Sequence, residues 1–275
     1  MNDVKTLKNM AKGLFYAICM PKNSSKPISI AFKRFTFSPK HYQRYQEITS
    51  WGESQIHPVY PYALLTDLHL QLVSDVGFPY SAFGILHRRE EITLLKSLGP
   101  GEWAFSCQLL DLNDQEGELT FKIRSELSIN GELCWVSQTY AIKRQTKRAK
   151  HLKKQDNVIS DITPWLKESR ELPCSLGLRY GLLSGNIDPI HIHPLSAKLM
   201  GHPTSIMHGM WGVAYSCSLF QREGHNVSLG NSISIKFISP IYLPREISYF
   251  SSENAQYFGL YNAERSRPHL LIELS

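Results

Sequence analysis

The pattern of apolar and polar positions repeats once along the chain, because each half has one helical stripe followed by several strand-like segments. The first stripe spans residues 64–76, where apolar side chains recur at spacings of three and four, and Gly77 and Pro79 end the helix. The second stripe spans residues 207–219 and is followed by Gly224. We expect the helices to bury Leu64, Leu68 and Leu72 in the first half and Met210, Ala214 and Ser218 in the second.

Partly alternating segments after each stripe predict antiparallel strands. They cover residues 83–95, 102–112, 118–127 and 132–142 in the first half, and 227–238, 245–251, 257–262 and 269–274 in the second. Asn130-Gly131, between two of these segments, predicts a type I′ hairpin turn. One helix with several antiparallel strands, present twice, is an α+β arrangement with an internal structural duplication. The pattern alone leaves the topology open.

The best domain boundary is a basic linker at residues 143–157, which has few large apolar residues. It separates a first domain at residues 28–142 from a second at residues 158–275. Residues 1–27 form a basic amphipathic arm at near-helical spacing. Such a helix could lie on a membrane surface, but its apolar face is short, so we favour packing against the parent domain.

Composition fits an ordinary globular protein of 275 residues, with 42% hydrophobic and 20% charged residues. These values exclude full disorder and a collagen-like fibre. No apolar run approaches the roughly 20 residues that span a bilayer, and residues 13–20 make a poor signal peptide, so we expect no integral membrane segment and a cytoplasmic location. The five dispersed cysteines without CxxC spacing suit buried reduced thiols, and Cys217 is expected to pack, since no base is placed for it.

The net charge of +6 is concentrated in two segments. Residues 1–40 hold eight lysines and arginines against one acid, and residues 143–154 hold seven and no acid, so the remainder is acidic. No nucleic-acid reading motif accompanies them, and we expect no nucleic-acid partner. A solvated linker is the favoured interpretation, with attraction for an anionic ligand such as the phosphates of coenzyme A as the alternative.

Candidate chemistry gathers between residues 180 and 210. Ser184-Gly185 is expected to end an apolar strand, and Asn186, Asp188 and His191 then fall within six residues of one turn. Gly209 begins the second helix, where unpaired backbone amides can bind a developing oxyanion on a thioester carbonyl. An Asp and a His facing such a helix make a sensible acid/base site.

On spacing alone, purely structural interpretations of these residues stay open. Asp188-Pro189 is then simply a turn, and His191 is a histidine satisfied by its surroundings. His193 and His202 lie nearby, but a His pair two residues apart before a proline has no fixed ligand geometry. Zinc needs three or four converging ligands, so we expect no metal.

The same segment resembles the signature of the MaoC-like dehydratases, the (R)-specific enoyl-CoA hydratase family. That signature has a Tyr, then Ser-Gly-Asp-x-Asn-Pro-Ile-His, a later Ala and Gly, and Ile-x-His-Gly-Met at a helix start. This chain matches it with Tyr180, Ser184, Gly185, Pro189, Ile190, His191, Ala197, Gly201, Ile206, His208, Gly209 and Met210. Weaker likenesses in residues 60–140 suggest the degenerate leading repeat of two-repeat members.

The resemblance implies a double hotdog, with two long central helices each wrapped by a curved antiparallel sheet. It implies reversible addition of water to a trans-2-enoyl thioester, giving the (3R)-hydroxyacyl thioester, on coenzyme A or acyl carrier protein and without a metal or redox cofactor. His191 would activate the water with Asp188 or Asn186, Gly209 N–H would bind the thioester oxygen, and Ser184 and Tyr180 would line the substrate site. A monomer or a homodimer of double hotdogs is expected.

The chain departs from the family at two positions. Asn186 stands where the family has its catalytic Asp, and Asp188 stands where it has Asn. An amide cannot accept and return a proton at neutral pH, whereas a carboxylate can. Asp188 could restore the dyad, His191 alone could support slow turnover, or the site could bind thioesters without hydrating them.

Overall fold

A computed structural model describes most of the chain outside its N-terminal arm and linker. The described residues are 30–75, 78–82, 84–115, 118–144, 165–227, 230–264 and 266–275, and for 165–167 only the backbone is described. The predicted arm at residues 1–27 and the linker from residue 145 onward lie outside them. The first two linker residues, Lys143 and Arg144, belong to a strand.

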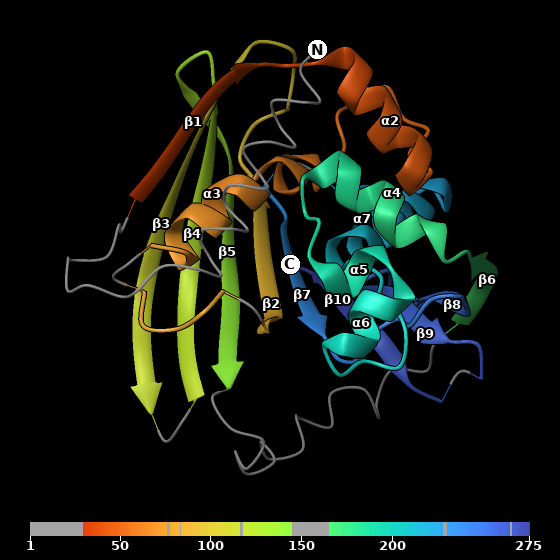
Figure 1. The fold of residues 1–275 in the computed structure, drawn as a ribbon. Coiled ribbons are helices and arrows are strands. Elements are labelled where there is room, and N and C mark those ends of the chain that lie inside the picture. Colours follow the sequence, from red (N-terminus) through yellow and green to blue (C-terminus); the bar gives the residue numbers. More distant parts are fainter. Residues whose placement is uncertain are drawn as a thin grey trace.

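One antiparallel sheet of ten strands runs through the molecule in the order β1-β3-β4-β5-β2-β7-β10-β9-β8-β6. The first half supplies β1 (Ile30–Thr36), β2 (Ile85–Leu94), β3 (Glu102–Gln115), β4 (Glu118–Ile129) and β5 (Glu132–Arg144). The second half supplies β6 (Trp165–Leu172), β7 (Ser232–Phe237), β8 (Arg245–Ser251), β9 (Tyr257–Asn262) and β10 (Pro268–Leu274). The halves join where β2 pairs with β7, so the sheet consists of two mirrored sets of strands (Figure 1).

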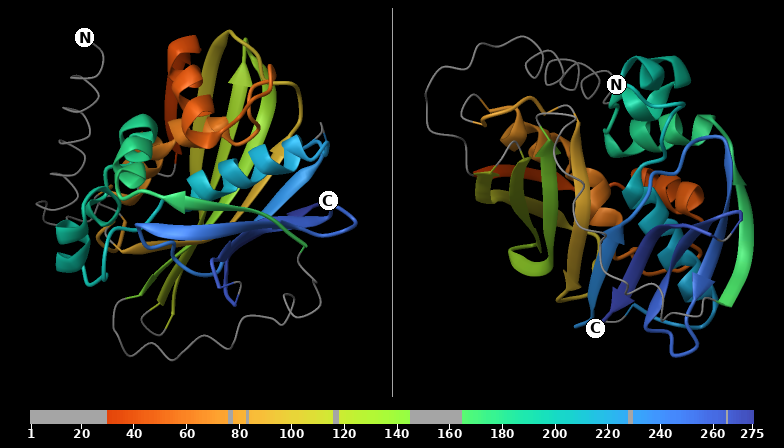
Figure 2. Two further views of the ribbon diagram at one scale, coloured as in Figure 1. Left: turned by 90° about the vertical axis from the view of Figure 1, so that its right-hand side faces the viewer. Right: turned by 90° about the horizontal axis from the view of Figure 1, so that it is seen from below.

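The helices lie on one side of this sheet (Figure 2). They are α2 (Pro39–Thr49), the 3₁₀ helix η1 (Tyr60–Leu64), α3 (Thr66–Val73), α4 (Ser175–Ser184), α5 (Pro189–Ile192), α6 (Pro194–Leu199) and α7 (Gly209–Arg222). The two predicted units, each with a helix packed on its own strands, are therefore confirmed.

Helix α7 is the buried centre of the second unit. Every side chain from Met210 to Phe220 is buried, which exceeds the one-sided stripe predicted from the sequence. Ser216 and Ser218 donate their hydroxyls to the carbonyls of Gly212 and Ala214 at 2.8 and 2.9 Å. The serines therefore satisfy their own polarity inside an apolar core.

The first helix is shorter than its sequence pattern. Leu68 and Leu72 are buried on α3 as predicted, but Leu64 lies half-buried in η1. A spacing of three residues serves a 3₁₀ turn as well as an α-helix, so the apolar pattern could not separate the two. The predicted Asn130-Gly131 turn is present, with positive φ at both residues and Ile129 facing Glu132 across it.

One local prediction is wrong. The apolar segment before Gly185 is not a strand but helix α4, which ends where Gly185 adopts a left-handed φ of 76°. Glycine takes this conformation without a Cβ clash, which makes it a common helix terminator. The edge strands β1 and β6 and the helix α2 also lack a counterpart in the sequence prediction.

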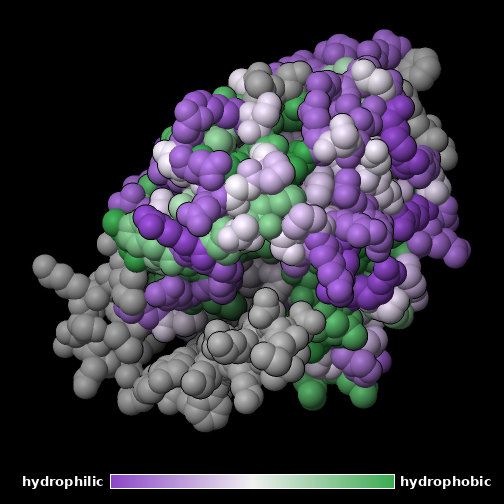
Figure 3. All heavy atoms as spheres, turned by 90° about the horizontal axis from the view of Figure 1, so that it is seen from above, coloured by the Kyte–Doolittle hydropathy of each residue, from purple (hydrophilic) through white to green (hydrophobic). Residues whose placement is uncertain are grey.

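Helices α4 and α6 carry exposed hydrophobic side chains, Leu182 on α4 and Leu195 and Leu199 on α6. Seen from above, the molecule shows hydrophobic surface at the lower edge of the view (Figure 3). Among the described residues, no helix is both long enough and apolar enough to cross a membrane. Cys107, Cys134 and Cys217 are buried free thiols as expected, whereas Cys174 is exposed just before α4.

Candidate active site

Two glycines of α4 bring the predicted site loop into direct contact with this helix. A Cβ on Gly177 would lie 2.3 Å from the carbonyl oxygen of His191, and one on Gly181 would lie 2.7 Å from that of Asn186. Real Cβ atoms are not found this close to backbone. Only glycine at these positions lets residues 185–192 lie flat against α4.

Short polar side chains hold the loop in shape. The Asn186 amide donates to Ser184 Oγ at 3.4 Å, and the Asp188 amide donates to Asn186 Oδ1 at 3.3 Å. Asp188 Oδ1 then accepts from the Ile190 amide at 3.1 Å and caps α5. Ser, Asn and Asp favour such turns because their side chains reach the backbone two residues on.

One ring nitrogen of His191 is fixed by a hydrogen bond, and no partner of the other is found among the described residues. Its Nδ1–H donates to the carbonyl oxygen of Ile206 at 2.7 Å, which places the lone pair of the neutral ring on Nε2. Burial lowers the pKa of His191, while the Ile206 hydrogen bond and the charge of Asp188 act in the opposite direction. A neutral imidazole with an open Nε2 can accept a proton from water.

His208 stacks on His191 and was not among the predicted site residues. The two ring centroids are 3.9 Å apart at an interplanar angle of 28°. His208 Nε2–H donates to the Asn186 carbonyl at 3.0 Å, and burial lowers its pKa well below the ordinary value. Its buried Nδ1 has no hydrogen-bond partner among the described residues. Its place in the Ile-x-His-Gly-Met motif was the only sequence signal for this role.

Helix α7 begins directly after His208, as predicted. Among the described residues no acceptor is found for the amides of Gly209 and Met210, as expected for the first turn of a helix. A Cβ on Gly209 would lie 2.7 Å from the ring of Phe237, so glycine is required for this helix start to pack on β7. The free amides at a helix start suit an oxyanion.

Tyr180 and Ser184 lie beneath the loop rather than beside open space. Both are buried on α4, with the Tyr180 ring centroid 5.1 Å from that of His208. Burial raises the pKa of Tyr180. Their contacts position His208 and the loop, whereas direct binding of a substrate by either side chain stays a prediction.

The Asp188 carboxylate and the His191 ring are not joined by a hydrogen bond in the part of the chain that the structure describes. Asp188 contacts His191 through its carbonyl, which accepts from the His191 amide at 2.9 Å, and its carboxylate caps α5. His193 is exposed and accepts a hydrogen bond from the Leu195 amide. Within the described ranges, no three His, Cys, Asp or Glu side chains are grouped to hold a metal ion.

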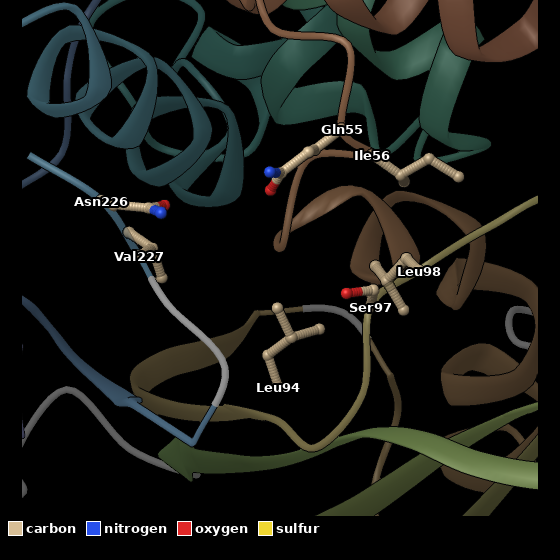
Figure 4. A pocket seen from close by; sticks show the side chains of 7 residues that line it. All are labelled: Gln55, Ile56, Leu94, Ser97, Leu98, Asn226 and Val227. Carbon is tan, nitrogen blue, oxygen red and sulfur yellow. The ribbon is translucent and has the colours of Figure 1, made fainter. Parts of the chain in front are cut away.

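Two surface cavities lie away from this loop. One, of about 360 Å³, lies where the residues following α7 meet the end of β2, and is lined by Gln55, Ile56, Leu94, Ser97, Leu98, Asn226 and Val227 (Figure 4). The other, of about 390 Å³, lies over the β2–β7 junction and is lined by residues such as Arg89, Glu91 and Ser234. Neither cavity is lined by a predicted site residue. The candidate site is therefore identified by its acid/base residues and by the start of α7, and not by a cavity.

The arrangement of strands and helices is that of known double-hotdog proteins. Crystal structures of HtdX from Mycobacterium tuberculosis superpose with a TM-score of 0.74 at 21% identity, one covering 89% of this chain and 98% of that one. A MaoC-like dehydratase from Phytophthora capsici gives 0.65 at 17% identity, over 90% and 96%. A conserved M. tuberculosis protein described as a double hotdog gives 0.59 at 9% identity, over 91% and 96%. The protein is therefore a double hotdog, as its motif implied.

Sequence comparison shows which double-hotdog proteins the chain resembles. Residues 170–256, in the second unit, match the family model of the MaoC like domain, so the predicted resemblance is confirmed. The chain is also 23% identical over 278 residues to the 3-hydroxyacyl-thioester dehydratase X of M. tuberculosis, covering 98% of both chains. The matched segment contains the whole loop and the start of α7.

Proposed function

We propose that the protein is a hydro-lyase that interconverts trans-2-enoyl and (3R)-hydroxyacyl thioesters. The observation that carries the proposal is His191, which stacks on His208 at the start of α7 and for whose Nε2 no partner is found among the described residues. The segment that holds both histidines matches the MaoC like domain. The relative named 3-hydroxyacyl-thioester dehydratase X supports the same reaction class. The substrate is an acyl thioester of coenzyme A or acyl carrier protein.

In the proposed hydration, the thioester oxygen accepts a hydrogen bond from the Gly209 amide. His191 Nε2 takes a proton from water as the water oxygen bonds to C3, and the electron pair of the C2–C3 double bond moves towards the carbonyl. His191 then returns the proton to C2, so one water is added and no group is oxidised or reduced. Asn186 orients the water through its amide but carries no proton.

The Asn186/Asp188 exchange makes this reaction slow. Loss of one acid/base group typically costs about 10²–10⁴-fold in rate. Asp188 contributes a negative charge that favours the protonated state of His191, but its carboxylate is engaged in capping α5. This engagement favours a second candidate function, a module that binds acyl thioesters without hydrating them.

We further propose a cytoplasmic location, supported by dispersed cysteines that are free thiols at the four described positions. The reaction as written requires no metal or redox cofactor. A monomer or a homodimer of double hotdogs stays a prediction.

Hydration of crotonyl-CoA and of longer trans-2-enoyl-CoAs tests the function. Purified protein is expected to remove the enoyl absorbance at a rate proportional to protein concentration. If thioesters bind by calorimetry but none is hydrated, even by Asn186→Asp, the binding module is the correct function. If nothing binds, both candidates are wrong.

A further inference from the structure

A buried polar group from the first unit lies across the β2–β7 junction from the candidate site. His87 and Glu90 are on β2, and His87 Nε2–H donates to Glu90 Oε2 at 2.9 Å. The Thr139 hydroxyl on β5 donates to the same oxygen at 2.7 Å. The Glu90 side chain is fully buried, and its other oxygen, Oε1, has no partner among the described residues. A buried acceptor left without a donor is costly and calls for an explanation.

This group is linked to the candidate site through packed rings. Phe237 on β7 packs against Gly209, and the centroid of its ring lies 4.5 Å from that of His87. On its other side the His87 ring stacks on Tyr62 of η1, at 5.8 Å and 16°. Strands β2 and β7 are neighbours in the middle of the sheet (Figure 1). A series of contacts thus connects Gly209 through the Phe237 ring to His87 and then to Glu90.

The orientation of a thioester follows from charge and packing. Its coenzyme A or carrier end bears phosphate and stays in water, so its acyl end points inward. The interior of the second unit is closed, since every side chain from Met210 to Phe220 is buried and a Cβ on Gly212 would lie 2.7 Å from Leu270. At the junction with the first unit, by contrast, the His87 side chain is 25% exposed, although Glu90 beside it is fully buried. The β2–β7 junction, where His87 lies, is therefore the inward path that we assign to the acyl chain.

The free atoms along this route are hydrogen-bond acceptors. In the tautomer whose Nε2–H donates to Glu90, Nδ1 of His87 carries a lone pair, for which no partner is found among the described residues. Glu90 Oε1 is an acceptor as well. An acyl chain made only of methylene groups would leave both unpaired, whereas a hydroxyl on the chain would donate to one of them.

We propose that His87 and Glu90 form an acyl-chain subsite that selects chains bearing a hydroxyl group. The proposal rests on the proposed function, because it places the thioester at Gly209. It adds the substrate class: an enoyl or acyl thioester with a hydrogen-bond donor on the chain beyond C3. Thr139 is a positioning residue that holds Glu90, and Tyr62 and Phe237 fix the plane of the His87 ring.

A matched pair of substrates tests the subsite. The hydration rate, as kcat/KM, is measured for trans-2-enoyl-CoAs of equal length that end in a hydroxyl or in a methyl group, over several lengths. We expect the hydroxylated chain to be preferred by about 10-fold or more at one length, because buried acceptors reject an analogue without the donor. Glu90→Gln and His87→Phe are expected to abolish the preference. Glu91→Gln, on the neighbouring position of β2, should retain it.

Binding measurements test the subsite independently of the proposed hydratase activity. Calorimetry with saturated acyl-CoAs, hydroxylated and plain, requires no turnover, so the expected preference is measurable even if hydration fails. Equal affinity for both chains at every length overturns the subsite, as does a preference that persists in folded Glu90→Gln and His87→Phe. Stronger binding of an amino-terminated than of a hydroxylated chain overturns the hydroxyl assignment. Near-ultraviolet circular dichroism identifies variants that fail to fold, and Thr139→Val then supplies the test.

Discussion

The two units begin alike and differ in what they do with a histidine. In each, the edge strand leads into a helix, α2 or α4, that ends at a residue with left-handed φ, Ser50 at 61° or Gly185 at 76°. In the first unit His57 follows, and both ring nitrogens are bonded: Nε2 to the Ala214 carbonyl at 3.1 Å and Nδ1 to the Val59 amide at 2.9 Å. For His191 in the second unit, a hydrogen bond is found only at Nδ1 within the part of the chain that the structure describes.

A histidine whose two ring nitrogens are both hydrogen-bonded has a structural role. A histidine with one ring nitrogen left unbonded can accept a proton in a reaction. His57 is fully buried and links the first unit to the centre of α7, so it fixes the relative position of the two units. His191 is fixed by one bond and has a free proton acceptor beside a helix start.

Removing the base has the largest effect. His191→Ala is expected to lower hydration by about 10²–10⁴-fold, because it removes the group that accepts the proton from water. His193→Ala, two residues further and exposed, is the control and should retain the rate. Steady-state kinetics on crotonyl-CoA measures both, and equal rates for the two variants would contradict the role of His191.

Displacing the loop has the next largest effect. Gly181→Ala would bring a Cβ within 2.7 Å of the Asn186 carbonyl and push the loop off α4. We expect a loss of up to about 10²-fold in kcat, since small displacements of catalytic groups are costly. Gly52→Ala, where a Cβ meets nothing within 4 Å, is the matched control. An unchanged kcat in Gly181→Ala would show that the loop is not part of the site.

Introducing a carboxylate at residue 186 should raise the hydration rate. Asn186→Asp is expected to accelerate hydration by roughly 10-fold or more, because it places a proton carrier in the family position. Asp188→Asn is expected to matter less, since the Asp188 side chain caps α5. If Asp188→Asn is the damaging change and Asn186→Asp is neutral or harmful, Asp188 has taken over the acid/base role. If neither substitution alters a measurable rate, the dyad assignment is wrong.

Acid should destabilise the fold through buried neutral histidines. Burial lowers the pKa of His57 and of His69 to about 3, and that of His269 to about 4. Between these values and the ordinary 6.5, each of these histidines binds more protons in the unfolded than in the folded chain. Their contribution to the free energy of unfolding is therefore constant above about pH 6.5 and falls as the pH decreases below it. Each histidine contributes up to about 1.4 kcal/mol per pH unit. Denaturant unfolding from pH 7 to 5 should show a shallower slope for His57→Gln than for exposed His193→Gln.

Salt should have the smallest effect. The basic segments at residues 1–40 and 143–154 are expected to attract the phosphates of coenzyme A, and affinity should fall modestly between about 50 and 200 mM salt. Calorimetric titration of one acyl-CoA across this range measures it. Salt-independent affinity would assign binding to the acyl chain alone.

Long periodic elements and the motif were predictable from the sequence, because both depend on local order. The strands at residues 245–251 and 257–262 appear with their predicted bounds, and α7 is the predicted buried helix. The apolar segment before Gly185 was mistaken for a strand because a short apolar run fits a buried strand or a buried helix equally well. His208 and the His87–Glu90 pair were missed because their roles arise from contacts between segments distant in the sequence.

The stereochemistry of hydration tests directly whether His191 is the base that forms a (3R)-hydroxyacyl thioester. A trans-2-enoyl-CoA is incubated with the wild-type protein and with His191→Ala, and the 3-hydroxyacyl product is resolved by chiral chromatography. We expect the (3R) product from the wild type and almost none from His191→Ala. A (3S) product, or a (3R) product formed equally well without His191, would contradict it.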